Sequence, residues 1–370
     1  MYDITFYPLG NADTSLVELE NGATILFDYA HVKCSETEDD KRCNLHQELN
    51  DAITKDYIDV VCFTHLDKDH VVGAKDFFYL NHSILYQGRD RKKINELWVP
   101  AEAITESKNS CNEDAKIIQS EARYRLKRAS GIRVFSRPKK LKEWCDKNEG
   151  YDFEKIKHLI VDAGEIVPTF SLDEDGVEVF AHCPFYSESR DVDRNGCAIV
   201  VHLTFNNFHK SKIMMGSDIP YDVWENIVNI TEAQGRTERL TWDVFHISHH
   251  CSYKSLAKEK GATKTEVSET INRLYDDYSN EGAFLISPSK PIPVVYGPAE
   301  GEQPPHKQAF NYYNQVENST IKVTMEEPTI EEPKPIKLSI GNSGVTLNSV
   351  PVAYISTSTP SSKPPRAGVK

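Results

Sequence analysis

The chain has 370 residues, 39% of them hydrophobic and 27% charged, which is enough for one large soluble domain with a sizeable core. Its formal net charge of −13 opposes binding along a nucleic-acid backbone. No apolar run reaches the roughly 20 residues of a membrane helix, and the first residues lack the pattern of a signal peptide. The eight cysteines are scattered without a CxxC pair, which predicts reduced thiols in a cytoplasmic protein that makes no membrane contact.

In the first hundred residues, apolar and polar side chains alternate as in strands, and one stretch has a helical pattern. Asn21-Gly22 is a strong signal for a hairpin turn. The segment 58–65 is almost continuously apolar, which is typical of a strand buried on both faces. The pattern predicts strands at 3–10, 14–30, 58–65 and 94–102, and a helix at 44–57.

The segment 105–150 is polar, basic and helical in character, and it resembles an insertion between two halves of a domain, 1–104 and 151–327. From Arg123 to Lys142 there are nine Lys or Arg residues and no acid. This is either an ordinary solvated helix and loop, or a positive platform that binds a phosphate-bearing substrate. In the second interpretation Arg125, Lys127 and Arg128 contact the substrate.

Strand patterns return in the second half of the chain, and the whole order is that of a mixed α/β fold. The sequence predicts strands at 156–167, 175–184, 197–205, 212–220, 239–250 and 282–289, and helices at 221–233 and 264–279. Residues 328–357 form a C-terminal extension that is rich in Pro and Glu and able to form strands. The Ser/Thr/Pro tail 358–370 is expected to be disordered.

Two histidines and two aspartates fall within six positions, in the stretch "HLDKDH" directly after the buried strand 58–65. His65, Asp67, Asp69 and His70 are either an ordinary charged turn or the ligands of two neighbouring metal ions. The loop after the carboxyl end of a buried strand suits metal binding, because the backbone is fixed and side chains can point into a cleft.

Three other predicted strands also end in residues able to bind a metal. Asp218 follows "IMMGS", and it is either a turn or helix cap or a carboxylate that reaches the same cleft. His182 ends "VEVFAH", and His249 and His250 end "VFHISHH". Each alone fits a structural role, but four such strand ends in one α/β chain favour a shared metal centre.

The motifs "LGNADTSLVELENGATILFDYA" and "FTHLDKDHVVGA" resemble the opening of a metallo-β-lactamase-fold hydrolase. They are most similar to the hydrolase domain of the bacterial competence DNA-uptake channel and its stand-alone relatives. That branch has an Asp, as at Asp67, in place of the second His of the HxHxDH motif, and a "PHHGS" motif that "SHHCS" resembles. The resemblance covers residues 3 to about 315 and implies an αββα sandwich of two mixed sheets flanked by helices.

The resemblance also implies a dinuclear centre of two divalent ions, Zn²⁺ or Mn²⁺. His65, Asp67 and His182 would hold one ion, and Asp69, His70 and either His249 or His250 the other. Asp218 would bridge the two. His250 is favoured over His249 because it directly precedes the small residue of the motif. Asp69 or Asp218 would act as the catalytic group that orients a metal-activated hydroxide.

The sequence departs from the family at three places. "GNAD" replaces "GQGD" but keeps Gly10 and Asp13; Ser217 is inserted between Gly216 and Asp218; and Cys251 stands where the family has a glycine that often serves a positive φ. None of these changes removes a ligand.

Three functions remain open from the sequence. The first is a phosphodiesterase or nuclease, favoured by the DNA-uptake likeness and by the basic segment. The second keeps the metals but acts on a small molecule such as a nucleotide or a lactone. The third is a metal-binding scaffold that binds partner proteins through its C-terminal extension, for example in an antiviral defence system.

Overall fold

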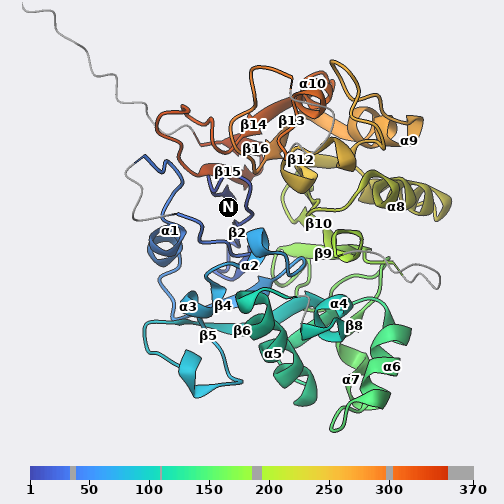
Figure 1. The fold of residues 1–370 in the computed structure, drawn as a ribbon. Helices are drawn as coiled ribbons and strands as arrows, with labels where there is room; N and C mark the ends of the chain where they lie inside the picture. The colour runs from blue at the N-terminus through green and yellow to red at the C-terminus, as the bar shows by residue number, and fades with distance from the viewer. Residues whose placement is uncertain (34–38, 109–110, 186–193, 297–302, 349–370) are drawn as a thin grey trace, which may run out of the picture.

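The computed structural model describes all residues except 34–38, 109–110, 186–193, 297–302 and 349–370. Two mixed β-sheets lie face to face, with helices on both outer sides (Figure 1). This is the αββα arrangement that the sequence predicts. In the described part of the chain, no helix is both long and apolar enough to cross a membrane. The predicted tail 358–370 lies outside the described residues.

Sheet A has ten strands in the described ranges, in the order β16-β15-β1-β2-β3-β4-β6-β7-β8, with β5 paired to β6. The strands from β3 to β8 are parallel, and those from β16 to β3 are antiparallel. Its members are β1 (Tyr2–Phe6), β2 (Ser15–Glu18), β3 (Thr24–Phe27), β4 (Tyr57–Cys62), β5 (Phe78–Tyr79), β6 (Lys92–Pro100), β7 (Ile132–Phe135), β8 (Ile160–Val161), β15 (Ile336–Gly341) and β16 (Gly344–Leu347).

Sheet B has six strands in the described ranges, in the order β14-β13-β12-β11-β10-β9. The strands from β11 to β14 are parallel, while β9 and β10 run antiparallel to their neighbours. Its members are β9 (Val177–Cys183), β10 (Val200–Phe205), β11 (Lys212–Met215), β12 (Trp242–His246), β13 (Ser279–Ser287) and β14 (Ser319–Val323).

Helices cover the outer face of each sheet and close a separate apolar core there. On sheet A, Ile118 and Leu126 of α5 pack in one buried cluster with Val61 and Leu97. On sheet B, Trp224 of α8 packs with Phe245. The helices are α1 (Leu45–Ala52), α2 (Lys68–Val71), α3 (Ala74–Phe77), α4 (Ala101–Thr105), α5 (Glu113–Lys127), α6 (Pro138–Lys147), α7 (Phe153–Ile156), α8 (Tyr221–Ala233), α9 (Glu269–Asn272) and α10 (Lys307–Tyr313).

The central core lies between the two sheets. Phe6 and Phe27 of sheet A are buried in the same cluster as Leu203, Met215 and Val244 of sheet B. Removal of apolar surface from water contributes roughly 25 cal/mol per Å² to folding. The buried contact between the two sheets therefore stabilises their packing against each other. It brings the loops at one edge of both sheets together.

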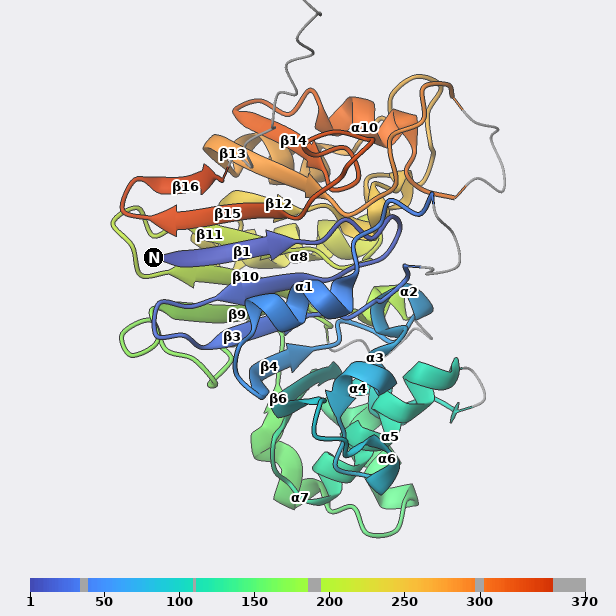
Figure 2. The ribbon, with the colours of Figure 1, turned by 90° about the vertical axis from the view of Figure 1, so that its left-hand side faces the viewer.

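Within the segment 105–150, which the sequence predicts to be an insertion, β7 pairs with β6 from Leu97↔Ile132 to Pro100↔Phe135, so this part of the segment belongs to sheet A. The strand expected at 156–167 is reduced to β8, a two-residue strand that follows α7. In the C-terminal extension, β15 pairs antiparallel with β1, and β16 lies beyond β15 at the edge of sheet A, as Figure 2 shows.

Candidate metal centre

The loop "HLDKDH" follows β4 and turns directly into α2, which begins at Lys68. His65 and His70 are buried, and their ring centroids lie 4.0 Å apart. The side chains of Asp67 and Asp69 are 38% and 37% exposed. The loop therefore directs its histidines inward and leaves its two acids at the rim.

Four buried side chains from four loops converge beside this turn. Asp13, His70, Asp218 and His250 each offer a ligand atom, and these atoms lie within 4.8 Å of one another. Asp13 comes from the loop between β1 and β2, and His70 from α2. Asp218 follows β11 and His250 follows β12, so both sheets contribute.

A hydrogen bond to a buried carboxylate orients His70. Its Nδ1 donates to Asp28 Oδ2 over 2.8 Å, and its Nε2 lies 3.5 Å from Asp218 Oδ2. Asp28 is fixed in turn by the backbone N–H and the hydroxyl of Thr64, both at 2.7 Å. A carboxylate behind a histidine is the usual support of a metal ligand, because it leaves Nε2 unprotonated and aimed at the ion.

His250 is oriented in the same way and His249 is not. The Nδ1 of His250 donates to Pro288 O over 2.9 Å, while its Nε2 lies 3.1 Å from Asp69 Oδ2 and 3.7 Å from Asp218 Oδ2. The His249 side chain is 25% exposed, and its Nε2 lies 4.0 Å from Asp218 Oδ2. The geometry therefore favours His250 as the ligand of this pair.

The loop after β12 has an unusual backbone. His249, His250 and Cys251 have φ values of 52°, 53° and 64°, and such left-handed conformations cost roughly 1–3 kcal/mol at a residue other than glycine. Cys251 thus adopts a positive φ, the conformation that glycine adopts most readily, and its side chain is fully buried. At the end of β11, a Cβ on Gly216 would lie 2.6 Å from His246 O, so a glycine there lets the two loops approach.

Asp13 is held from two sides. Its Oδ1 accepts a hydrogen bond from Nε2 of His246 over 2.7 Å, and its backbone N–H donates to Asp69 O over 3.0 Å. The sequence keeps Asp13 within "GNAD" but gives it no role in the centre, and it also misses His246 and Asp28. The signal for Asp28 was its place at the end of β3, the same strand-end rule that singles out Asp218.

Several buried polar atoms of the cluster have no hydrogen-bond partner among the described residues. They are Asp13 Oδ2, His65 Nε2, His70 Nε2 and Asp218 Oδ1. An unpaired buried polar group costs roughly 1–3 kcal/mol, more for a charged one. Two imidazole nitrogens and two carboxylate oxygens, three of them on side chains of the converging group, are donors that suit a divalent cation.

The charges of the cluster are strongly coupled. Burial acts to lower the pKa of His70, but Asp28 and Asp218 raise it well above its ordinary value. Burial likewise acts against the charged form of His250, yet Asp218 and Asp69 raise its pKa to about 9. For Asp218, burial would raise the pKa, and His250 and His70 hold it well below the ordinary range.

Asp67 lies at the rim and is paired with an arginine. Arg194 Nη1 is 2.7 Å from Asp67 Oδ1, and its Nε is 2.9 Å from Glu106 Oε2. His65 Nε2 is 3.8 Å from Asp67 Oδ2. The sequence patterns did not indicate Arg194.

The structure places His182 away from the cluster. Its Nε2 bonds the backbone carbonyl of Arg239 over 3.0 Å, and its ring lies against those of Phe180 and His202. It lines a small cavity of about 80 Å³ that also includes Ile230 and Gln234 of the α8 region. We therefore do not include His182 in the centre proposed below.

The three basic residues expected to contact substrate do not lie at the centre either. Arg125 is buried, and its guanidinium binds Glu121 and the carbonyls of Ile94, Asn95 and Gly131. Ile94 pairs with Ile58, near the start of β4. The centre lies beyond the other end of this strand, at Cys62. Four residues of strand separate Ile58 from Cys62, so Arg125 binds carbonyls at least about 13 Å from the end of β4 that leads to the centre. Lys127 and Arg128 are exposed at the same far edge and contact Tyr151 and Tyr124.

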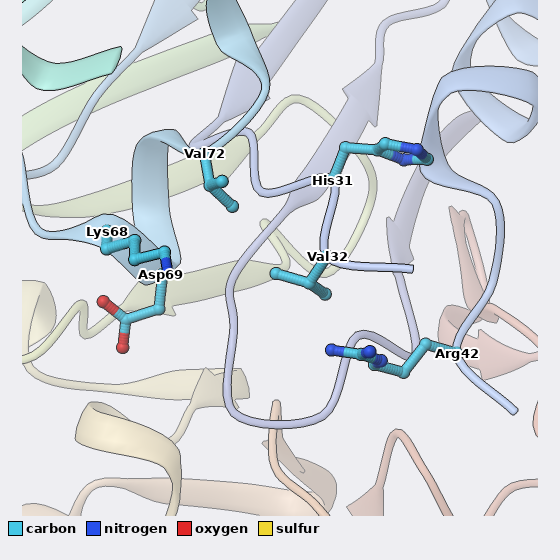
Figure 3. A pocket seen from close by; sticks show the side chains of 6 residues that line it. All are labelled: His31, Val32, Arg42, Lys68, Asp69 and Val72. Carbon is cyan, nitrogen blue, oxygen red and sulfur yellow. The ribbon is translucent and has the colours of Figure 1, made fainter. Parts of the chain in front are cut away.

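A pocket of about 530 Å³ opens beside Asp69 (Figure 3). It is lined by His31, Val32, Arg42, Lys68, Asp69 and Val72. Figure 3 shows Lys68, Asp69 and Val72 on one side of it and the other three on the opposite side. Its volume falls within the range of small-molecule sites.

No family model and no curated protein matches the chain. Solved structures that resemble it include a diphosphatase of the PhnP family, at 11% identity and a TM-score of 0.37, with 92% of this chain and 98% of that chain covered. Unliganded yeast PDE1 matches at 11% identity and a TM-score of 0.44, with 87% and 97% covered. A long form of RNase Z from yeast matches at 12% identity and a TM-score of 0.31, with 78% and 40% covered. Matches this distant do not assign a function, which has to come from the site.

Proposed function

We propose that this protein is a metal-dependent hydrolase that cleaves phosphodiester bonds. The observation that carries the proposal is the convergence of buried carboxylates and imidazoles whose ligand atoms lie within 4.8 Å of one another. Divalent ions of the Zn²⁺ or Mn²⁺ kind suit these donors, and a bound ion lowers the pKa of a water and neutralises charge on a phosphoryl oxygen.

The residues of the chain have separable roles in this proposal. His70, His250 and Asp218 hold the metal centre, and His65 lies beside His70 with a bare Nε2 that faces the same region. Asp69 is the acid that both approaches the centre, 3.1 Å from His250 Nε2, and lines the open pocket. It is therefore placed to accept the proton of the attacking water, the role expected for Asp69 or Asp218 from the sequence.

Arg42 and Lys68 support a substrate that carries negative charge. Both line the pocket, on either side of it, next to Asp69. Arg42 also pairs with Asp40 at 2.6 Å, so its guanidinium is held beside the pocket. A phosphate that enters this pocket would meet two cations before it reaches the centre.

The dimensions of the pocket favour the second candidate function, a small nucleotide as substrate, over a long nucleic acid. The expected basic platform lies at the far edge of sheet A, and the net charge is −13. A pocket of about 530 Å³ holds one or two nucleotide units rather than a long duplex. We therefore expect cyclic nucleotides or short oligonucleotides to be better substrates than plasmid DNA.

The test is hydrolysis by purified protein with Mn²⁺ or Zn²⁺. The substrates are bis(p-nitrophenyl) phosphate, cyclic nucleotides, short oligonucleotides, and single-stranded and plasmid DNA and RNA. We expect turnover that EDTA abolishes and that Asp218→Asn reduces by at least about 10³-fold. Absence of turnover with any metal, or equal turnover by Asp218→Asn, would refute the proposal. A scaffold role with partner proteins, in antiviral defence or elsewhere, is the function to pursue in that case.

A further inference from the structure

We infer that Asp13 is a direct metal ligand through its Oδ2 atom and that it takes the place which the motif "HLDKDH" would assign to Asp67. The inference deepens the proposed function, on which it rests for the existence of a metal centre. It changes the ligand set to Asp13, His70, Asp218 and His250.

The first argument is that the two carboxylate oxygens of Asp13 differ in their hydrogen bonding. Oδ1 accepts the hydrogen bond of His246 Nε2 at 2.7 Å, while Oδ2 has no partner among the described residues. The residue is 3% exposed, so water does not serve Oδ2 from the surface. A carboxylate with one oxygen fixed and the other bare and buried is prepared to bind a cation.

The second argument is that the surroundings fix Asp13 as they fix the histidine ligands. Asp28 and the Pro288 carbonyl orient His70 and His250 from behind, and His246 orients Asp13 in the same way. His246 is itself 3% exposed, ends β12 and stacks on Phe6 at 5.9 Å between ring centroids. All of these supports come from sheets or their first flanking loop, so the donor atoms have little freedom to move.

The third argument concerns Asp67 and His182, two of the expected ligands, which lie outside the cluster of four. The Oδ1 of Asp67 is bound to Arg194 at 2.7 Å and its side chain is 38% exposed. The Nε2 of His182 bonds the Arg239 carbonyl, and its side chain lines a cavity with Ile230 and Gln234. Neither residue belongs to the group of four buried side chains whose ligand atoms lie within 4.8 Å of one another, whereas Asp13 does, and its Oδ2 has no partner among the described residues.

The test is metal binding without substrate, measured by calorimetry with Zn²⁺ and Mn²⁺ and by metal content after dialysis. Asp13→Asn keeps the acceptor for His246 and removes the charge. Loss of a supporting contact costs about 10–100-fold in metal affinity, so loss of a ligand is expected to cost more than about 100-fold. The metal affinity of His246→Gln is expected to be about 10–100-fold weaker than that of the wild type.

Two variants serve as controls. Asp67→Asn is expected to bind metal as the wild type does, and Asp59→Asn, a partly buried acid at the other end of β4, is the matched control.

Wild-type affinity in Asp13→Asn, or loss of metal in Asp67→Asn but not in Asp13→Asn, would overturn the inference. Circular dichroism and thermal melting check that the variants fold. Should Asp13→Asn not fold, crystals of the wild-type protein soaked in Zn²⁺ decide the question. The anomalous peak is expected about 2.0–2.2 Å from Asp13 Oδ2, and a peak out of bonding reach of that atom would overturn the inference. Metal bound through Asp13 without any hydrolysis would refute only the proposed function.

Discussion

The choice between His249 and His250 shows how a side chain's second hydrogen bond decides its role. The two residues are adjacent and both have a positive φ, so sequence and backbone shape do not separate them. The difference is that Nδ1 of His250 is tied to the Pro288 carbonyl. That bond orients the imidazole so that its Nε2 faces the carboxylates of Asp69 and Asp218, beside which the proposed ion would be held.

From this difference we expect His250→Ala to lower Zn²⁺ affinity by more than about 100-fold and His249→Ala by much less. Calorimetric titration of both variants measures the effect, and each variant serves as the control for the other. Equal losses would show that both imidazoles bind the metal, and a larger loss in His249→Ala would reverse our assignment.

At the rim of the pocket we expect Arg42→Ala and Lys68→Ala to raise KM for a phosphodiester more than they lower kcat, because both cations bind the substrate rather than the reacting atoms. Steady-state kinetics with bis(p-nitrophenyl) phosphate and with a cyclic nucleotide provide the check. Exposed Lys127→Ala at the far edge is the matched control. A lower kcat with unchanged KM would place these residues elsewhere in the reaction.

At the scale of elements, α5 shows how a basic sequence is used for structure. Glu121 is fully buried between Arg125 and His82. The guanidinium of Arg125 also fastens the helix to carbonyls at the start of β6 and the turn before β7. We therefore expect Arg125→Met to destabilise the fold by about 3–5 kcal/mol, with turnover per folded molecule unchanged. Urea unfolding measures the stability, and active-site titration measures turnover per folded molecule. Wild-type stability with lost turnover would instead indicate that Arg125 contacts the substrate.

The same pair predicts a pH dependence of stability. Burial would raise the pKa of Glu121, but His82 and Arg125 lower it from 4.5 to about 2. Because the folded pKa lies below the unfolded one, the charged carboxylate stabilises the fold above about pH 4.5, and this contribution is lost as the pH falls toward 2. We expect Glu121→Gln to be less stable than the wild type at pH 7 and to lose less stability on acidification. Parallel melting curves of the two proteins from pH 7 to 3 would contradict this.

Much of the fold and part of the centre could be predicted at this scale. The short apolar strands are local patterns, so β4, β11 and β12 agree with the structure, and the loops or helix that follow them carry His70, Asp218 and His250 into one cluster. Asp13 and Asp28 were missed as parts of the centre because a ligand role depends on which atoms remain unpaired, which no spacing records. The expected substrate role of Arg125 failed to anticipate its contacts for a similar reason. Apart from Glu121, its partners are backbone carbonyls, and a carbonyl has no signature in the sequence.

At the scale of the whole molecule, the centre joins the two sheets at one edge. Asp13 and His70 belong to loops of sheet A, and Asp218 and His250 to loops of sheet B. A bound ion therefore acts as a cross-link between the halves of the sandwich. At a free metal concentration of 100 times Kd the linkage amounts to about 2.7 kcal/mol.

We therefore expect EDTA to lower the Tm of the metal-loaded protein by several degrees, and Zn²⁺ or Mn²⁺ to restore it. Scanning calorimetry measures the shift, and Asp218→Asn, which lacks one of the proposed ligand carboxylates, is expected to show none. A wild-type Tm that is indifferent to both chelator and metal would mean that no ion joins the sheets.

The pairing of β15 with β1 means that sheet A cannot be completed until the end of the chain has been synthesised. Ser339 and Asp3, which share a hydrogen bond across this pair, are 336 residues apart. A ribosome that adds about 5–20 residues per second produces β1 long before β15 exists. Throughout that interval one edge of β1 has no strand beside it, and an open edge invites pairing with other chains. The nascent chain is therefore open to such pairing at β1 until β15 has been made.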